Sequence, residues 1–178
     1  MSPGPEPDPY DLDLPSGWKR IDRWIIRTTR VVACGVGMAF TVLVTFEVAS
    51  RYLFNFSFFA INSVVTFLLV WFFLLGAGLA LRLRAHVGFE VAVSRVPPAV
   101  ARVMFVASQA LCFVFFASLV WSGYRALEPA TQQVDGALGL SLFWVMLAIP
   151  IGFLLLIYNQ AAMFYAALRK APGDELKP

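Results

Sequence analysis

Residues 47–55 read Glu47-Val48-Ala49-Ser50-Arg51-Tyr52-Leu53-Phe54-Asn55 and interrupt an otherwise apolar part of the chain. The runs on either side, residues 31–46 and 56–81, carry no charged residue. A glutamate four residues before an arginine lies on the same helix face, in the order that favours an ion pair. Arg51 and Asn55 also suit a helix C-terminus, where a cation meets the dipole and asparagine accepts the left-handed conformation. The stretch therefore predicts the end of a membrane helix, with Glu47 and Arg51 offsetting each other's charge.

The composition is that of a multi-pass membrane protein. Of the 178 residues, 60% are hydrophobic and 14% are charged, whereas a soluble domain averages roughly a quarter charged. The net charge of +3 is too small to indicate a nucleic-acid partner. Cys34 and Cys112 both lie in apolar runs, and His86 is the one histidine of the sequence. A disulfide, a bis-histidine haem, a histidine-rich metal site and other cofactors are therefore not expected.

Four spans are expected, at residues 25–46, 56–81, 103–124 and 138–160. The first would measure about 33 Å as a helix, which is enough to cross the hydrocarbon core. The last apolar run would reach about 48 Å, more than one crossing needs, so we expect Pro150 to kink it. Asn159 and Gln160 are expected at the far membrane interface. Two sets of small residues predict close contacts between helices: Gly35 with Ala39, and Gly76, Ala77, Gly78 and Ala80.

The remaining segments are expected at the edges of one four-helix domain, residues 17–170. Residues 1–16 are rich in proline and acidic residues, which predicts a disordered tail. Because the chain starts with acidic rather than basic residues, no cleaved secretory signal is expected. Residues 171–178 form a polar tail, and a short connection from Glu128 to Gly136 is expected before the last span.

Residues 85–96 are expected to form a short arm between the second and third spans. From His86 to Ser94, apolar and polar residues alternate as in a strand, but a helical apolar stripe is also present. A lone strand at a membrane surface would leave backbone groups unpaired, so a short interfacial amphipathic helix is favoured. Pro97-Pro98 is expected to end this arm and start the next helix. To the arm we assign Arg82, Arg84, His86, Phe89 and Arg95.

The positions of the basic residues predict the orientation. Of the 14 Lys and Arg residues, only Arg51 and Arg125 lie on one side of the expected spans. The other twelve lie in the N-terminal segment, in the loop 82–102 and in the C-terminal tail. Lys and Arg accumulate on the cytoplasmic side of membrane proteins. Both termini and this loop are therefore expected in the cytoplasm, and Glu47 near the outer side.

The order of these features resembles a known family, the DctQ-like small integral membrane subunit of tripartite ATP-independent periplasmic (TRAP) transporters. The resemblance covers roughly residues 20–170 and rests on Glu47-x-x-x-Arg51-Tyr52-x-Phe54-Asn55, Gly76-Ala77, Arg82, Arg84, His86-Val87 and Pro97. It implies structural or assembly roles for Glu47, Arg51, Tyr52, Asn55 and Asn62. Many members carry an acidic, Trp-containing stretch just after the Asn, but residues 56–63 contain no acid here.

The resemblance also implies a function. Such a subunit forms a four-helix unit beside a much larger polytopic membrane subunit, which moves substrate and sodium by an elevator-like motion. A periplasmic binding protein delivers the substrate, often an organic acid. The small subunit would be a scaffold for the stationary part in the bacterial inner membrane, and not an enzyme. The residues agree, because this chain offers no discontinuous helix pair, no inverted repeat and few intramembrane polar groups, the features from which transporters build midplane sites.

Two other classes fit parts of the pattern. A small proton-coupled multidrug exporter also has four spans and one carboxylate in the first, and Glu47 would serve that role. An unpaired Glu47 deep in the membrane would favour this exporter. A membrane enzyme would need a metal or an acid–base cluster, which His86 and scattered acids do not supply.

Overall fold

The computed structural model describes residues 10, 12, 15–56, 59–84 and 97–169, and within them the regular structure is helical. The helices are α1 (Ser16–Phe54), α2 (Phe59–Arg84), α4 (Pro98–Gln132), α5 (Phe143–Met146) and α6 (Ala148–Arg169). Three of them, and α5 taken together with α6, are long and apolar enough to cross a membrane. The predicted all-α fold with four spans is confirmed. The predicted arm 85–96 lies outside the described residues.

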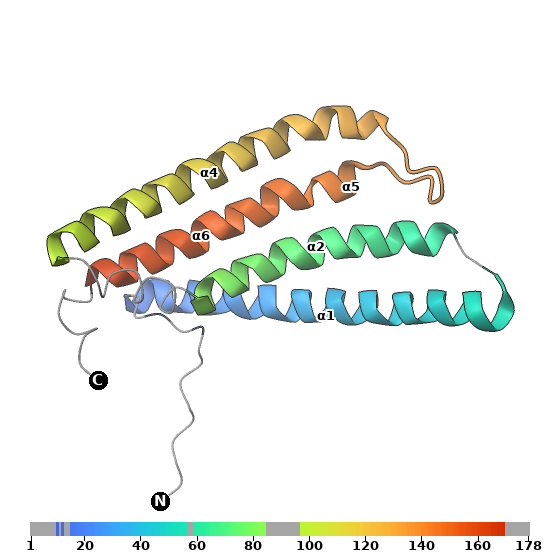
Figure 1. Cartoon of the computed structure of the whole chain (residues 1–178), viewed down its shortest axis with the longest axis horizontal. Coiled ribbons are helices and arrows are strands. Elements are labelled where there is room, and N and C mark those ends of the chain that lie inside the picture. The colour runs from blue at the N-terminus through green and yellow to red at the C-terminus, as the bar shows by residue number, and fades with distance from the viewer. Residues whose placement is uncertain (1–9, 11, 13–14, 57–58, 85–96, 170–178) are drawn as a thin grey trace, which may run out of the picture.

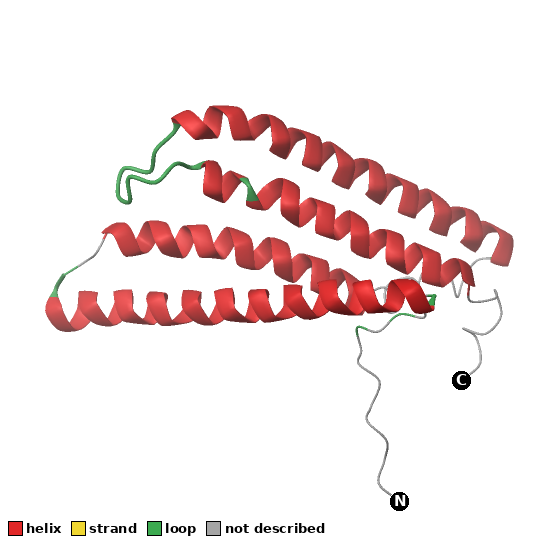
Figure 2. Ribbon diagram, turned by 180° about the vertical axis from the view of Figure 1, so that it is seen from behind, coloured by secondary structure: helices red, strands yellow, loops and turns green. Residues whose placement is uncertain are grey.

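The helices lie in a row (Figure 1). α1 packs against α2, α2 against α6, and α6 against α4, so α1 and α4 form the two edges. Figure 2 shows the same order from behind. The chain direction alternates from helix to helix, so each long helix runs between the same two ends of the bundle. The start of α1 and the end of α6 lie at one of these ends, which we call the terminal end. The turn between α4 and α5 lies at the opposite end, the turn end.

α1 extends beyond the predicted span at both ends. It begins at Ser16, and the Pro15 carbonyl accepts the N–H groups of Trp18 and Lys19 at 2.9 and 3.0 Å. Its 39 residues correspond to about 58 Å of helix. Asn55 ends it with φ 50° and ψ 30°, the left-handed cap expected from the sequence.

Glycines set the spacing between neighbouring helices. A Cβ on Gly37 would lie 2.6 Å from an aromatic ring of α2, and one on Gly152 would lie 2.7 Å from a side chain of α2. A Cβ on Gly123 of α4 would lie 2.7 Å from a side chain of α6. In contrast, Gly35 and Gly76 have nothing within 4 Å. The predicted close-packing face of α2 is confirmed at Gly78, where a Cβ would lie 3.1 Å from Leu155 of α6. The sequence could not single out Gly78 from Gly35 and Gly76, because residue spacing alone does not show which face of a helix is covered.

The fourth crossing starts later than the predicted residue 138. Residues 134–141 form a tight turn with a bridge between Val134 and Ser141 and with Gly139 at φ 66°. The helix is then interrupted at Leu147, between α5 and α6. Pro150 has no N–H to donate to the carbonyl four residues earlier, which weakens the helix at that point. The kink at Pro150 stays a prediction.

α4 also differs from the expected boundaries. It starts at Pro98 directly after Pro97, as predicted. It then continues through Pro129 to Gln132, where the sequence had placed a connection beginning at Glu128. A proline this close to the end removes a hydrogen bond only in the last turns, so the helix tolerates it.

Candidate functional site

A buried ion pair joins α1 to α2 at the terminal end. The side chains of Arg82 and Asp22 are 1% and 3% exposed. Arg82 donates from Nη1 to Asp22 Oδ2 over 3.0 Å and from Nη2 to Oδ1 over 2.5 Å. The hydroxyl of Tyr158, on α6, donates to Asp22 Oδ1 over 2.9 Å. Three helices thus meet at one carboxylate, and the two-pronged Arg–carboxylate contact is the strong form of such a pair.

The segment before α1 joins the same network. Arg82 Nη1 also donates to the carbonyl of Tyr10 over 3.1 Å. The guanidinium of Arg30 lies over the Tyr10 ring, 5.4 Å from its centre. Tyr10 packs against a buried apolar cluster formed by Ile26, Ala33, Leu75 and Leu79. The expectation that residues 1–16 are unpacked therefore does not hold at Tyr10. Its carbonyl is bonded to Arg82, and its side chain packs against the apolar cluster.

The sequence reasoning missed Asp22 and placed Arg82 in the arm. Asp22 is the single acidic residue between positions 14 and 46, and this isolation among basic residues could have marked it. Arg82 lies in the last turns of α2 because this helix continues to Arg84. Arg84, also assigned to the arm, is the last residue of α2. The remaining arm residues, His86, Phe89 and Arg95, lie outside the described residues.

α6 buries two amide side chains beside this network. Asn159 is completely buried, and Gln160 Nε2 donates to Gln109 Oε1 of α4. Four nearby buried atoms have no hydrogen-bond partner within the described chain: Asn159 Nδ2, Asn159 Oδ1, Gln160 Oε1 and Arg82 Nε. The sequence had placed this pair at a membrane interface. α6 continues to Arg169, so the pair falls inside the helix and between its neighbours.

The ion pair expected in residues 47–55 is present at the turn end. Arg51 Nη2 lies 2.7 Å from Glu47 Oε1, and the two side chains are 60% and 11% exposed. Ser50 Oγ donates to the Glu47 carbonyl over 3.1 Å. The other residues expected in assembly, Tyr52, Asn55 and Asn62, are exposed. Of this group, Glu47 is the residue withdrawn into the chain.

Asp135 holds the tight turn at the same end. Its Oδ1 accepts the N–H groups of Ala137 and Leu138, each at 2.9 Å, and its Oδ2 accepts the hydroxyl of Ser63 at 3.1 Å. The N–H of Leu138 is the main reason why the pKa of Asp135 lies below its ordinary value of 3.8, and Ala137 and Ser63 add to this against desolvation. Asp135 therefore places an acid beside the start of α2, where residues 56–63 contain none.

The arrangement is suited to holding helices together. At the terminal end a buried acid meets a buried base from another helix, and at the turn end the buried Glu47 meets the exposed Arg51 of the same helix. In the part of the chain that the structure describes, no three His, Cys, Asp or Glu residues are grouped so that they could hold a metal ion. These ion pairs therefore connect α1 to α2 at the terminal end and stabilise the end of α1 at the turn end.

A comparison with known families identifies the chain. Residues 40–170 match the family model of the "Tripartite ATP-independent periplasmic transporters, DctQ component". No curated protein matches the chain. The family match starts within α1 and includes α2, α4, α5 and α6, while Asp22 lies before it. This family consists of transporter components rather than enzymes. Because the match covers most of the chain, the protein belongs to the DctQ component family of the tripartite ATP-independent periplasmic transporters.

Proposed function

We propose that this chain is the small scaffold subunit of a sodium-driven TRAP-type secondary transporter that imports organic-acid-like solutes. A periplasmic binding protein delivers the solute, and a larger polytopic membrane subunit carries it across by an elevator-like motion. This chain enlarges and stabilises the stationary part of that large subunit. The family match supports a place in a tripartite transporter.

The observation that carries the scaffold role is the row of helices. Each helix packs mainly against its neighbours in the row, with the Tyr158–Asp22 hydrogen bond as an added contact between α6 and α1, and α1 and α4 remain edges. The most apolar stretch of α4 has no residue buried within the chain, and that of α1 has almost none. Two long apolar faces are thus available to lipid and to a partner subunit.

The exporter alternative is less well supported. A proton-coupled exporter would need an unpaired carboxylate deep in the membrane. Glu47 instead contacts Arg51, and it lies seven residues before the end of α1, which is about 10 Å along the helix. A paired acid near a helix end fits a structural role better than proton transfer.

We further propose that Glu47, Arg51, Tyr52, Asn55 and Asn62 contribute to assembly with the large subunit. The exposed side chains at the turn end support this role, since a partner can reach them. Co-purification tests it: Tyr52→Ala and Asn62→Ala should lower the yield of the complex while the helical content is unchanged. Normal recovery of the complex from both variants would remove these residues from the interface.

The chain is proposed to lie in the bacterial inner membrane with the terminal end in the cytoplasm. The bias of Lys and Arg towards that end supports this orientation. The test uses a chain whose Cys34 and Cys112 are replaced by alanine, with single cysteines at Gly17 or Thr131, both exposed positions. A membrane-impermeant thiol reagent applied to intact cells should label Thr131→Cys and not Gly17→Cys. The reverse pattern would invert the proposed orientation.

Reconstitution tests the function itself. Liposomes that contain this chain alone should accumulate no organic acid in a sodium gradient. Liposomes that contain the large subunit and this chain, with the binding protein outside, should accumulate it. The large subunit without this chain is the control, and uptake should fall in that case. Uptake by this chain alone, or full uptake without it, would refute the scaffold role.

A further inference from the structure

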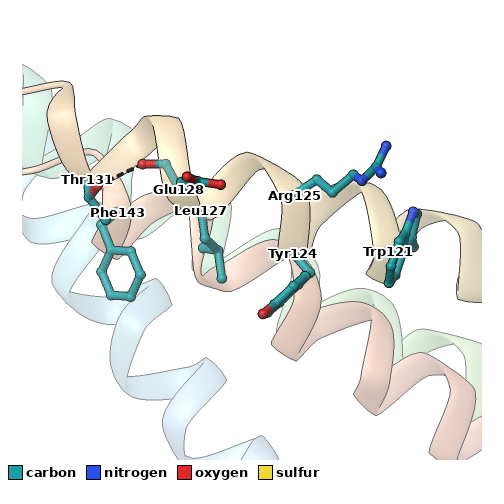
Figure 3. Close-up of a pocket in the computed structure, with 7 residues that line it drawn as sticks. All are labelled: Trp121, Tyr124, Arg125, Leu127, Glu128, Thr131 and Phe143. Atoms are coloured by element: carbon teal, nitrogen blue, oxygen red, sulfur yellow. Dashed lines mark hydrogen bonds between the residues drawn. The ribbon is translucent and has the colours of Figure 1, made fainter.

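A groove beside α4 and α5 lies near the turn end, and its lining includes no member of either ion pair. Its volume is about 490 Å³, within the range of roughly 300–1,000 Å³ for small-molecule sites. Trp121, Tyr124, Arg125 and Glu128 of α4 line it, together with Phe143 of α5 (Figure 3). Apolar rings and both signs of charge therefore meet in one place.

The position along α4 puts this groove at the membrane interface. Residues 103–120 contain no charge, and as a helix they cover about 27 Å, close to the thickness of the hydrocarbon core. Trp121 and Tyr124 follow directly, and both are exposed. Trp and Tyr gather where the core meets the headgroups. Arg125 and Glu128 come next and fall in the headgroup layer.

The two charges of the groove are open to a ligand. Arg125 and Glu128 are three residues apart, so they share one face of α4, and Figure 3 shows them following Trp121 along the helix. Among the described residues, neither forms a salt bridge. The Arg125 guanidinium lies over the Trp121 ring, 5.3 Å from its centre. A zwitterion with a phosphate beside an ammonium would complement this pair.

We propose that this groove binds the headgroup of a phospholipid with a primary ammonium, the ethanolamine type. Arg125 donates to the phosphate, the Glu128 carboxylate accepts from the ammonium, and Tyr124 packs against the glycerol region. An anionic headgroup is disfavoured because it brings no cation to Glu128. A quaternary ammonium is disfavoured because it has no N–H to donate, and Arg125 already covers one face of Trp121. This inference goes beyond the transport role and holds whichever leaflet the turn end faces.

Native mass spectrometry of the full chain, purified in mild detergent and mixed with defined lipids, tests the proposal. The probes are phosphatidylethanolamine, phosphatidylcholine and phosphatidylglycerol with identical acyl chains. The wild-type chain should retain the ethanolamine lipid best. Arg125→Gln should lower that retention about tenfold, the usual effect of one charge-assisted hydrogen bond. Glu128→Gln should abolish the preference for ethanolamine over choline.

Controls separate a specific site from general charge effects and from misfolding. Arg27→Gln removes one exposed cation at the terminal end and should leave lipid retention unchanged. Arg125→Lys and Glu128→Asp keep the charges and should keep the preference for ethanolamine. Unchanged retention by Arg125→Gln, or a wild-type preference for either other lipid, would overturn the proposal. Displacement of the lipid by free phosphoethanolamine or inorganic phosphate would also overturn it, because the site would then bind a soluble anion.

Discussion

Replacing Arg82 by glutamine should strongly destabilise the protein, because the change leaves a buried carboxylate without its cation. Asp22 accepts three hydrogen bonds, two from Arg82 and one from Tyr158. Charge-assisted hydrogen bonds contribute roughly 1.5–3 kcal/mol each. Removing one member of a buried pair costs roughly 3–5 kcal/mol. Both routes lead to the same range, so we expect Arg82→Gln and Asp22→Asn each to lower the free energy of unfolding by about 3–5 kcal/mol.

The double variant should be less damaged than the sum of the single variants. With both charges replaced by amides, no uncompensated ion remains in the core. The coupling energy between Asp22 and Arg82 should therefore be about 2 kcal/mol or more, within the range known for residues in one network. Tyr158→Phe should cost less, about 1.5 kcal/mol, because it removes one of three bonds and leaves the ion pair intact.

Equilibrium unfolding of the reconstituted chain, followed by circular dichroism in mixed micelles with increasing SDS, measures these differences. Arg27→Gln is the matched control, because it removes an exposed cation from α1 and should change stability by less than about 0.5 kcal/mol. If the effects of Arg82→Gln and Asp22→Asn add to within about 0.5 kcal/mol, the two side chains are not coupled. A cost below about 1 kcal/mol for Arg82→Gln would likewise refute the buried pair.

Three further predictions follow from the same contacts. Gly152→Ala should cost about 1–3 kcal/mol by forcing α2 and α6 apart, whereas Gly76→Ala, with open space around it, should gain up to about 1 kcal/mol in the same unfolding experiment. Arg51→Gln should lower the free energy of unfolding by about 1–2 kcal/mol, because it leaves the buried Glu47 unpaired. Glu47→Gln should lower it by about 0.5 kcal/mol, because Arg51 reaches water. Equal losses would contradict this asymmetry. Backbone N–H groups hold the pKa of Asp135 below 3.8, so the carboxylate stabilises the turn fully above pH 3.8 and loses this effect as the pH falls further. Hydrogen exchange in residues 134–141 should show this loss, and Asp135→Asn should abolish the pH dependence.

The four spans could be predicted because a membrane imposes their length and composition. Backbone groups in lipid must be satisfied within the helix, so charge-free runs of sufficient length identify the crossings. The helix ends were less predictable, because a helix can continue through polar residues once it has left the lipid. α1 begins at Ser16 within a basic segment, and α4 passes through Pro129. The tight turn was missed because it depends on the side chain of Asp135 and the positive φ of Gly139.

The candidate site likewise contains one ion pair that could be predicted from the sequence and one that could not. Glu47 and Arg51 are four residues apart, so helix geometry alone brings them together. Asp22 and Arg82 are 60 residues apart, and only the packing of α1 on α2 brings them into contact. Sequence patterns within one helix carry no information about such pairs. An isolated acid in a basic segment was the available signal, and it indicates that a partner exists without identifying it.

The contacts that join α1, α2 and α6 differ in strength from those that join α4 to α6, and this difference affects how the chain can serve as a scaffold. α1, α2 and α6 meet at Asp22 through side chains that are almost fully buried. α4 is joined to α6 by one amide contact, Gln160 to Gln109, and by aromatic pairs such as Phe105 with Phe164. Neutral contacts of this kind are weaker than a buried, two-pronged ion pair. The α1–α2–α6 part is therefore the more rigid surface to present to the stationary part of a large subunit, while the α4 edge can adjust to the lipid around it.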